Sequence, residues 1–253
     1  MRILITNDDG IHSPGLEQLE EVARELSDDV WVVAPEFDNS GVSHSLSLSD
    51  PLRLREAAPR RFAVKGTPTD CVILATRHIL KDQAPDLVLS GINRGSNVAE
   101  DVTYSGTVAG AMEGTILGIP SIAFSQAYGR SGRANIKWHC GRHHGAGLIR
   151  RLVDQGIPDG VLLNVNFPDC EPADVRGVAV TAQGRRDKEL LSIEERADGR
   201  GNPYFWIGFS RKHYEPGNGT DLKALAENRI SVTPLRLDLT DEPTMTQLAQ
   251  TLR

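Results

Sequence analysis

Short, continuous runs of apolar residues alternate with amphipathic segments along the first two thirds of the chain. Continuous apolar runs are typical of buried parallel strands, because a strand covered on both faces has no solvent side to make polar. We expect five such strands, at residues 3–6, 30–34, 87–90, 121–124 and 161–165.

The amphipathic segments between these runs carry helix start signals. Pro14 and Gly15 precede the segment 16–26, and Thr67 followed by Pro68 opens the segment 69–80. A threonine at the N-cap and a proline at the first helical position favour a helix start. Alternating strands and helices predict an α/β fold, a doubly wound three-layer sheet whose ligand crevice lies beyond the carboxyl ends of the strands.

The pattern changes after about residue 182. A charged stretch at 184–201 is followed by a strand-like run at 204–209, a turn-rich segment, a second strand-like run at 230–235 and a terminal helix near 245–252. We therefore predict a core at residues 1–182 and a C-terminal extension at 183–253. An arm of this kind, from 184 to 221, lacks a core of its own and is expected to pack on a neighbouring subunit.

Composition narrows the class of protein. The 253 residues carry a net charge of −6, which weighs against a surface for a nucleic-acid duplex. Three cysteines without a C-x-x-C pair indicate reduced thiols. The chain begins with a strand and has no apolar run long enough to span a bilayer, so we expect a soluble cytoplasmic protein that does not bind membranes.

The first chemical signal is the pair Asp8 and Asp9, placed where the first strand should end. Adjacent carboxylates repel each other, and a cation relieves that repulsion. Hard oxygen donors suit Mg²⁺, Mn²⁺ or Ca²⁺ better than a metal that prefers thiolates. The alternative for this pair alone is a solvated turn, since Asp, Asn and Gly are common turn formers.

Two further polar loops follow predicted strands. In the loop after the second strand, Ser40 offers a neutral oxygen ligand, and His44 is more often a hydrogen-bonded surface histidine than a catalyst. In the loop at 90–97, Asn93 offers a carbonyl oxygen to a metal and Asn97 an amide to a phosphate. Arg94 is left out of the predicted site, because an arginine in a polar loop is more often solvated or ion-paired.

Ser105, Gly106 and Thr107 lie at the predicted N-terminus of the helix 108–117. Small hydroxyl residues and a glycine at a helix N-terminus are suited to bind phosphate, although plain N-capping is the favoured explanation of these residues taken alone. Because these residues and the three polar loops converge on one edge of the sheet, the sequence predicts a metal ion beside a phosphate cradle.

Together these segments resemble the SurE family, the survival-protein-E type of 5′-nucleotidase. The resemblance covers most of the chain in collinear order, through Thr6-Asn7-Asp8-Asp9-Gly10, Val33-Ala34-Pro35, Gly66-Thr67-Pro68-Thr69-Asp70-Cys71-Val72, Ser90-Gly91-Ile92-Asn93-Arg94-Gly95, Ser105-Gly106-Thr107-Val108 and Ser231-Val232-Thr233-Pro234-Leu235.

The resemblance implies a Rossmann-like core and one divalent metal ion per subunit, Mg²⁺ or Mn²⁺, bound at Asp8, Asp9, Ser40 and Asn93. It implies hydrolysis of nucleoside 5′-monophosphates, which some members extend to 3′-nucleotides and short polyphosphate. It also implies a homodimer or homotetramer with exchanged C-terminal elements.

As a mechanism, we expect a metal-bound or Asp9-oriented water to attack phosphorus while Ser105, Gly106 and Thr107 hold the other oxygens. An aspartyl-phosphate route with Asp8 as nucleophile stays open. The haloacid-dehalogenase type of phosphatase, which uses that route, carries Asp-x-Asp, whereas here the two acids are adjacent.

The sequence allows three alternatives, namely a zinc site, a receiver module and a dinucleotide-binding enzyme. His139, Cys140, His143 and His144 resemble a zinc cluster but lack a third firm ligand on one helix face. A receiver module also places adjacent acids after its first strand, but the chain is too long and no phosphoacceptor aspartate follows the third strand. A dinucleotide-binding enzyme would need G-x-G-x-x-G after the first strand, and the sequence has none.

Overall fold

The structure is a computed structural model that describes residues 1–129, 132–186, 191–209 and 215–252. Its strands are β1 (Ile3–Thr6), β2 (Val30–Pro35), β3 (Arg53–Ala58), β4 (Arg61–Lys65), β5 (Leu87–Arg94), β6 (Ser121–Gln126), β7 (Val161–Phe167), β8 (Val178–Val180), β9 (Leu191–Ala197), β10 (Pro203–Phe209) and β11 (Ile230–Arg236). Its α-helices are α1 (Pro14–Arg24), α2 (Pro68–Leu74), α3 (Gly106–Ile116), α4 (Trp138–Gln155), α5 (Asp221–Ala226) and α6 (Glu242–Thr251).

The main sheet has nine strands in the order β3-β4-β2-β1-β5-β6-β7-β11-β8. In this order, each pair of neighbours from β4 through β2, β1, β5 and β6 to β7 is parallel. The pairs β3–β4 and β7–β11 are antiparallel. The carboxyl ends of β1, β2 and β5 therefore meet at one edge of the sheet, because neighbouring parallel strands end on the same side.

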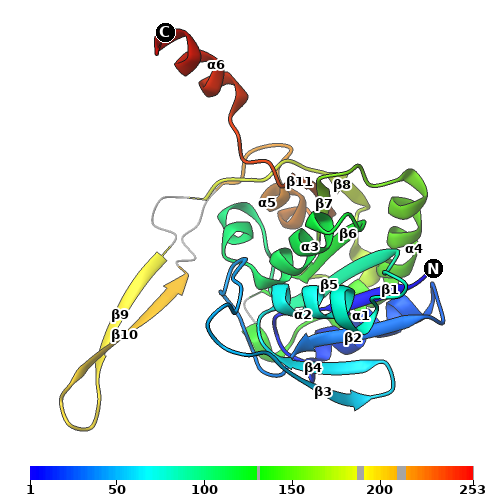
Figure 1. The fold of residues 1–253 in the computed structure, drawn as a ribbon. Coiled ribbons are helices and arrows are strands. Elements are labelled where there is room, and N and C mark those ends of the chain that lie inside the picture. The colour runs from blue at the N-terminus through cyan, green and yellow to red at the C-terminus, as the bar shows by residue number, and fades with distance from the viewer. Residues whose placement is uncertain (130–131, 187–190, 210–214, 253) are drawn as a thin grey trace.

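Helices cover both faces of this sheet (Figure 1). On one face, α1 and α4 pack with Ile3, Ile5 and Leu89 in the largest apolar cluster. On the other face, α2 packs with Leu4 and Val88, and α3 contributes to a third cluster with β6 and β7. Alternate residues of β1 serve opposite faces, which explains why the strand is apolar at successive positions.

The predicted Rossmann-like three-layer fold with a C-terminal hairpin and helix is confirmed. All five predicted strands are present, and α1, α3 and α6 lie within a few residues of their predicted ranges. The helix predicted at 69–80 is α-helical only to Leu74 and continues as a π-helix over Ala75–Ile79. The edge strands β3 and β8, and β4 next to β3, were not predicted.

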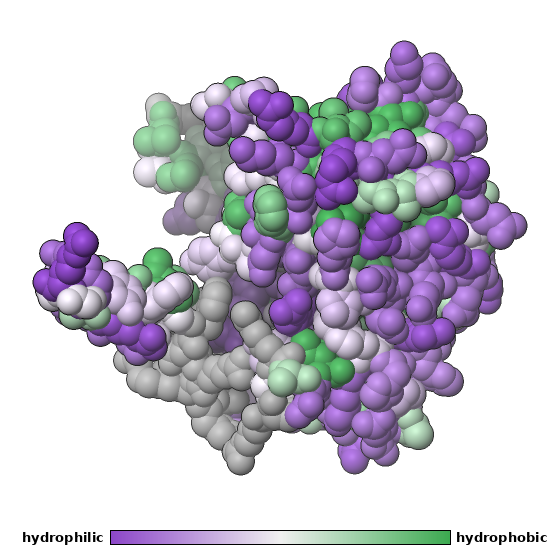
Figure 2. Space-filling view, turned by 90° about the horizontal axis from the view of Figure 1, so that it is seen from below, coloured by the Kyte–Doolittle hydropathy of each residue, from purple (hydrophilic) through white to green (hydrophobic). Residues whose placement is uncertain are grey.

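The C-terminal extension has two kinds of structure. The returning strand β11 enters the main sheet between β7 and β8, so it is part of the core sheet. The hairpin β9–β10 forms a separate two-stranded sheet, and both it and α6 project from the body (Figure 1). The space-filling view shows the projecting chain with hydrophobic and hydrophilic residues mixed along it (Figure 2). The predicted boundary at residue 182 stays a prediction, and residues 187–190 and 210–214 of the predicted arm lie outside the described residues.

In the part of the chain that the structure describes, no helix combines the length and the apolar composition that a membrane crossing requires.

Candidate active site

Asp8 lies two residues after the end of β1 and is held at the N-terminus of α3. Its side chain is buried, and Thr107 donates to it twice, from Oγ1 to Oδ1 at 2.5 Å and from the backbone N–H to Oδ2 at 3.1 Å. Gly106 permits this approach, because a Cβ there would lie 2.8 Å from the Asp8 Cβ. The helix N-terminus that favours an anion thus already holds a carboxylate of the chain.

The electrostatics of Asp8 follow from this burial. The pKa of the Asp8 carboxyl is raised to about 7, mainly by burial and also by the charge of Asp9, while the hydrogen bonds from Thr107 lower it. Two adjacent carboxylates with little access to water are costly to ionise together. A bound cation would remove that cost.

The carboxylate of Asp9 accepts a hydrogen bond from Arg94, the residue that follows Asn93. The Arg94 backbone N–H donates to Asp9 Oδ2 at 2.9 Å, and the Arg94 Nε lies 3.9 Å from Asp9 Oδ1. Arg94 is not part of the predicted site, where it is expected to be solvated or ion-paired. In the structure both its backbone and its guanidinium lie next to Asp9. The contact follows from the pairing of β1 with β5, because this pairing sets the ends of the two strands side by side.

Asn93 lies where β5 resumes its pairing with β6, opposite Ser125. The register between these strands shifts between Ser90 and Asn93. The Asn93 side chain donates from Nδ2 to the Gly95 carbonyl oxygen at 2.9 Å. This bond uses the nitrogen end of the amide, so the oxygen end is turned away from Gly95 and suits the predicted role as a ligand.

The loop after β2 lies against the backbone of Asp8. The Asn39 N–H donates to the Asp8 carbonyl oxygen at 2.7 Å. Ser40 is exposed, and its hydroxyl donates to Asp38 Oδ1 at 2.6 Å instead of to either acid of the pair. The structure thus places Ser40 near the site through Asn39, while its contact with a metal stays a prediction. Further along the loop, His44 Nε2 lies 2.9 Å from Glu113 Oε2, so the expected hydrogen-bonded histidine is present.

The residues predicted to contact phosphate are already engaged. The Ser105 hydroxyl caps α3 by accepting from the Val108 N–H at 3.0 Å, and the Ser105 carbonyl accepts from Ala109. The buried Asn97 donates from Nδ2 to Ser125 Oγ at 3.0 Å. Phosphate contacts of Asn97, Ser105, Gly106 and Thr107 stay predictions.

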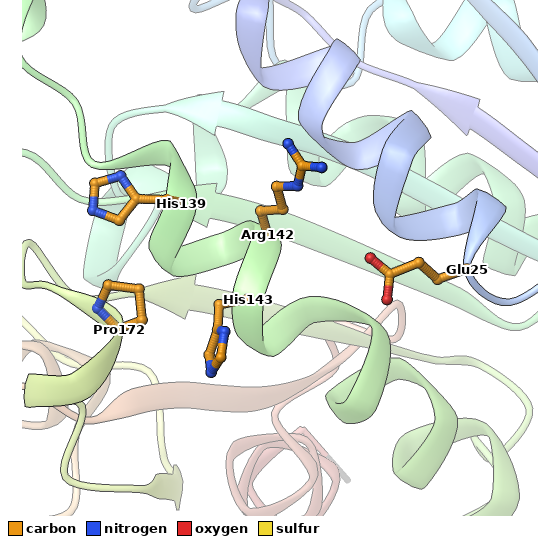
Figure 3. Close-up of a pocket in the computed structure, with 5 residues that line it drawn as sticks. All are labelled: Glu25, His139, Arg142, His143 and Pro172. Carbon is orange, nitrogen blue, oxygen red and sulfur yellow. The ribbon is translucent and has the colours of Figure 1, made fainter.

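Of the histidine cluster of α4, His139 and His143 line a pocket of about 400 Å³, together with Arg142, Glu25 and Pro172. Figure 3 shows His139, Arg142 and His143 projecting from α4, with the two histidines beside Pro172 and Glu25 reaching in from the end of α1. His139 Nε2 lies 2.6 Å from Glu171 Oε2. Among the described residues, no three His, Cys, Asp or Glu side chains come together as metal ligands.

The chain is similar to known proteins over almost its whole length. A family model described as survival protein SurE matches residues 3–190. The chain is 74% identical over 250 residues to "5′-nucleotidase SurE" of Methylobacterium nodulans, covering 99% of each chain. It is 66% identical over 250 residues to "5′-nucleotidase SurE" of Azorhizobium caulinodans, covering 99% of this chain and 98% of the other.

Among solved structures, the chain is similar to the crystal structure of the SurE protein from Aquifex aeolicus. The TM-score is 0.86 at 42% sequence identity, and all of both chains is covered. The likeness therefore extends to the C-terminal extension as well as to the core.

Proposed function

This chain belongs to the survival protein SurE family, and from that membership we propose that it removes phosphate from nucleoside 5′-monophosphates with the help of a divalent metal ion. The observation that carries the proposal is the pair Asp8 and Asp9, each held by a separate element at the carboxyl edge of the sheet. The relatives that bear the name 5′-nucleotidase SurE support the reaction class.

The donor set suits a hard divalent cation such as Mg²⁺ or Mn²⁺. Asp8, Asp9, Ser40 and Asn93 would hold it through two carboxylates, a hydroxyl and an amide oxygen. Burial and mutual repulsion at the acid pair are the features that a cation would relieve. When bound, the ion supplies Lewis-acid stabilisation of charge on the transferred phosphoryl group.

The protein's own groups divide the remaining work. Thr107 fixes the carboxylate of Asp8, and the Arg94 backbone fixes that of Asp9, so neither acid must reorganise during the reaction. Asp9 orients the attacking water toward phosphorus. The start of α3 holds phosphate oxygens, as helix N-termini commonly do. Asn97 adds its second amide hydrogen, because Ser125 receives only one of the two.

We also propose that the hairpin arm joins copies of the chain. Ile193, Phe205, Trp206 and Ile207 are exposed on it, and Met245 and Leu248 are exposed on α6. Exposed apolar clusters of this kind mark contact surfaces, and an element that lies away from its own body is suited to exchange between subunits. A homodimer or homotetramer with exchanged C-terminal elements is the expected assembly.

A cytoplasmic location fits the cysteines. Cys71, Cys140 and Cys170 are all buried and all unpaired, as expected in a reducing compartment.

The test is phosphate release from nucleoside 5′- and 3′-monophosphates and from short polyphosphate, after chelation and after Mg²⁺ or Mn²⁺ is added back. The proposal expects release from 5′-monophosphates that returns only with the metal. Release that survives chelation would contradict metal dependence, and no release with either metal would contradict the phosphatase assignment. The same panel decides whether 3′-nucleotides and polyphosphate are substrates.

A further inference from the structure

Two asparagines interrupt the apolar pattern of β7, an interior strand of the sheet between β6 and β11 (Figure 1). Asn164 and Asn166 have no solvent exposure. They share a strand face with Leu162, which packs in the cluster beside α3. Apolar side chains would fill this face without a desolvation cost, whereas buried amides are favourable only when their hydrogen bonds are made.

Both amides bind the backbone of one residue, Asn97. Asn166 Oδ1 accepts from the Asn97 N–H at 2.8 Å, and its Nδ2 donates back to the Asn97 carbonyl oxygen at 3.2 Å. Asn164 Nδ2 donates to the same carbonyl oxygen at 2.8 Å. The Asn97 side chain adds a bond to the fully buried Ser125 of β6. A loop residue is thus held on two rigid strands.

Asn97 lies in the loop after β5, the strand whose last two residues are Asn93 and Arg94. Four residues before it, Asn93 is a proposed ligand, and three residues before it, Arg94 grips Asp9. Between them and Asn97, the Gly95 N–H donates to the Gln126 carbonyl oxygen at 3.0 Å, which ties the middle of the loop to β6. The end of β5 is therefore bound to Asp9, and the loop that follows it is bound to β7 through Asn97.

We propose that Asn164 and Asn166 are positioning residues of the active site, which hold the segment 93–97, the end of β5 and the loop after it, so that Asn93 and Arg94 meet the acid pair. The proposal rests on the metal-dependent function proposed above. Neither asparagine touches substrate or metal, and their effect passes through the Asn97 backbone. Groups that orient metal ligands in this way typically change metal affinity or activity by about 10–100-fold when removed.

The test compares Asn166→Ala with Thr233→Val. Thr233 lies opposite Asn164 on β11, is equally buried, and bonds to Thr181 instead of to the loop, so it controls for lost stability. Hydrogen exchange of the peptide 93–98 and Mn²⁺ affinity by calorimetry are measured on the full chain. In Asn166→Ala we expect exchange to speed up by about tenfold or more and Mn²⁺ affinity to fall by about 10–100-fold. Thr233→Val should leave both within about twofold while its unfolding temperature falls.

Asn164→Leu, which keeps the number and branching of the side-chain heavy atoms, is the second variant if Asn166→Ala does not fold. It should shift both readouts in the same direction but less, because Asn166 still holds Asn97. Variants with unchanged exchange and unchanged Mn²⁺ affinity would overturn the positioning role. A wild-type protein that neither binds Mn²⁺ nor releases phosphate would instead overturn the proposed function, and the loop exchange would still decide whether the asparagines hold Asn97.

Discussion

At the carboxyl edge of the main sheet, Asp8 is 4% exposed and receives two hydrogen bonds from Thr107, whereas Phe205 and Ile207 of the hairpin arm are 60% and 72% exposed. The edge places polar groups where water is scarce, and the arm places apolar groups where water is abundant. Each arrangement costs free energy in the isolated chain.

The difference teaches what each region lacks. The acid pair at the edge carries two carboxylates, of which Asp9 lies beside the Arg94 guanidinium, and a divalent cation would add positive charge next to both. The arm lacks a covering surface, which a second copy of the chain would provide. Each region thus points to a different occupant, and substitutions in one should leave the occupant of the other in place.

The largest effect is expected from Asp9→Asn. The substitution keeps the shape of the side chain and removes one charge from the pair, so turnover of a nucleoside 5′-monophosphate should fall by several powers of ten. The oligomer and the unfolding temperature should not fall with it. Steady-state kinetics with added Mn²⁺ measure the effect, and Asp159→Asn, in an exposed loop just before β7, is the control. Near-native turnover in Asp9→Asn would remove the acid pair from the mechanism.

A smaller loss of activity is expected from Gly106→Ala. The new Cβ would lie 2.8 Å from Asp8 Cβ, so Asp8 or the start of α3 must move. A displacement of about 1 Å at a reacting group costs about 100-fold in rate.

Gly147→Ala is the matched control for that substitution. Gly147 is exposed in α4 and a Cβ there meets no atom within 4 Å, so alanine should stabilise the helix by about 0.5–1 kcal/mol without loss of activity. Kinetics and denaturant unfolding of the two variants separate crowding at the site from a general effect of alanine. Full activity in Gly106→Ala would show that the close contact is not needed.

The arm is tested by placing charges on one cross-strand pair. Ile193 and Ile207 lie directly opposite each other in the β9–β10 hairpin and are both 72% exposed. The double variant Ile193→Asp/Ile207→Asp should shift the protein from an oligomer to a monomer, because a charge buried in a contact surface is strongly unfavourable. Light scattering after size exclusion measures the mass, with Glu195→Gln as the control. An unchanged mass would place the subunit contact elsewhere.

The smallest effect is expected at Asp29, which directly precedes β2 and whose carbonyl oxygen accepts from the N–H of Ile3 at the start of β1. Hydrogen bonding and charge from Arg2 lower the pKa of the Asp29 carboxyl, despite its partial burial. Its contribution to stability is therefore present above the ordinary pKa of 3.8 and is lost as pH falls through the lower folded value. Because the pair is partly exposed, Asp29→Asn should cost less than about 1 kcal/mol at neutral pH.

Unfolding of native protein and Asp29→Asn across pH measures this contribution. The difference should shrink to nothing in strong acid, whereas Asp82→Asn, in an exposed loop, should show no such trend. A difference that grows as the pH falls would contradict the assigned direction.

The strands and the acid pair were predictable because they depend on local pattern. A strand buried on both faces must be apolar at successive positions, so 3–6, 121–124 and 161–165 stood out without any knowledge of their neighbours. Asp8 and Asp9 at the end of such a strand follow from the same reasoning. By contrast, β3 is exposed at every position and carries no apolar pattern, so nothing in its sequence marked it as a strand.

The partners of the site residues were decided by the tertiary structure. The sequence by itself determined the order of strands and helices, the acid pair and the polar loops around it, because each depends on residues close together in the chain. Only the fold decided that Thr107 would bind Asp8, that Arg94 would grip Asp9, and that Asn166 would hold Asn97 across 69 positions. Such bonds depend on strand order and register, which arise from packing between distant segments and leave no periodic signal in the sequence.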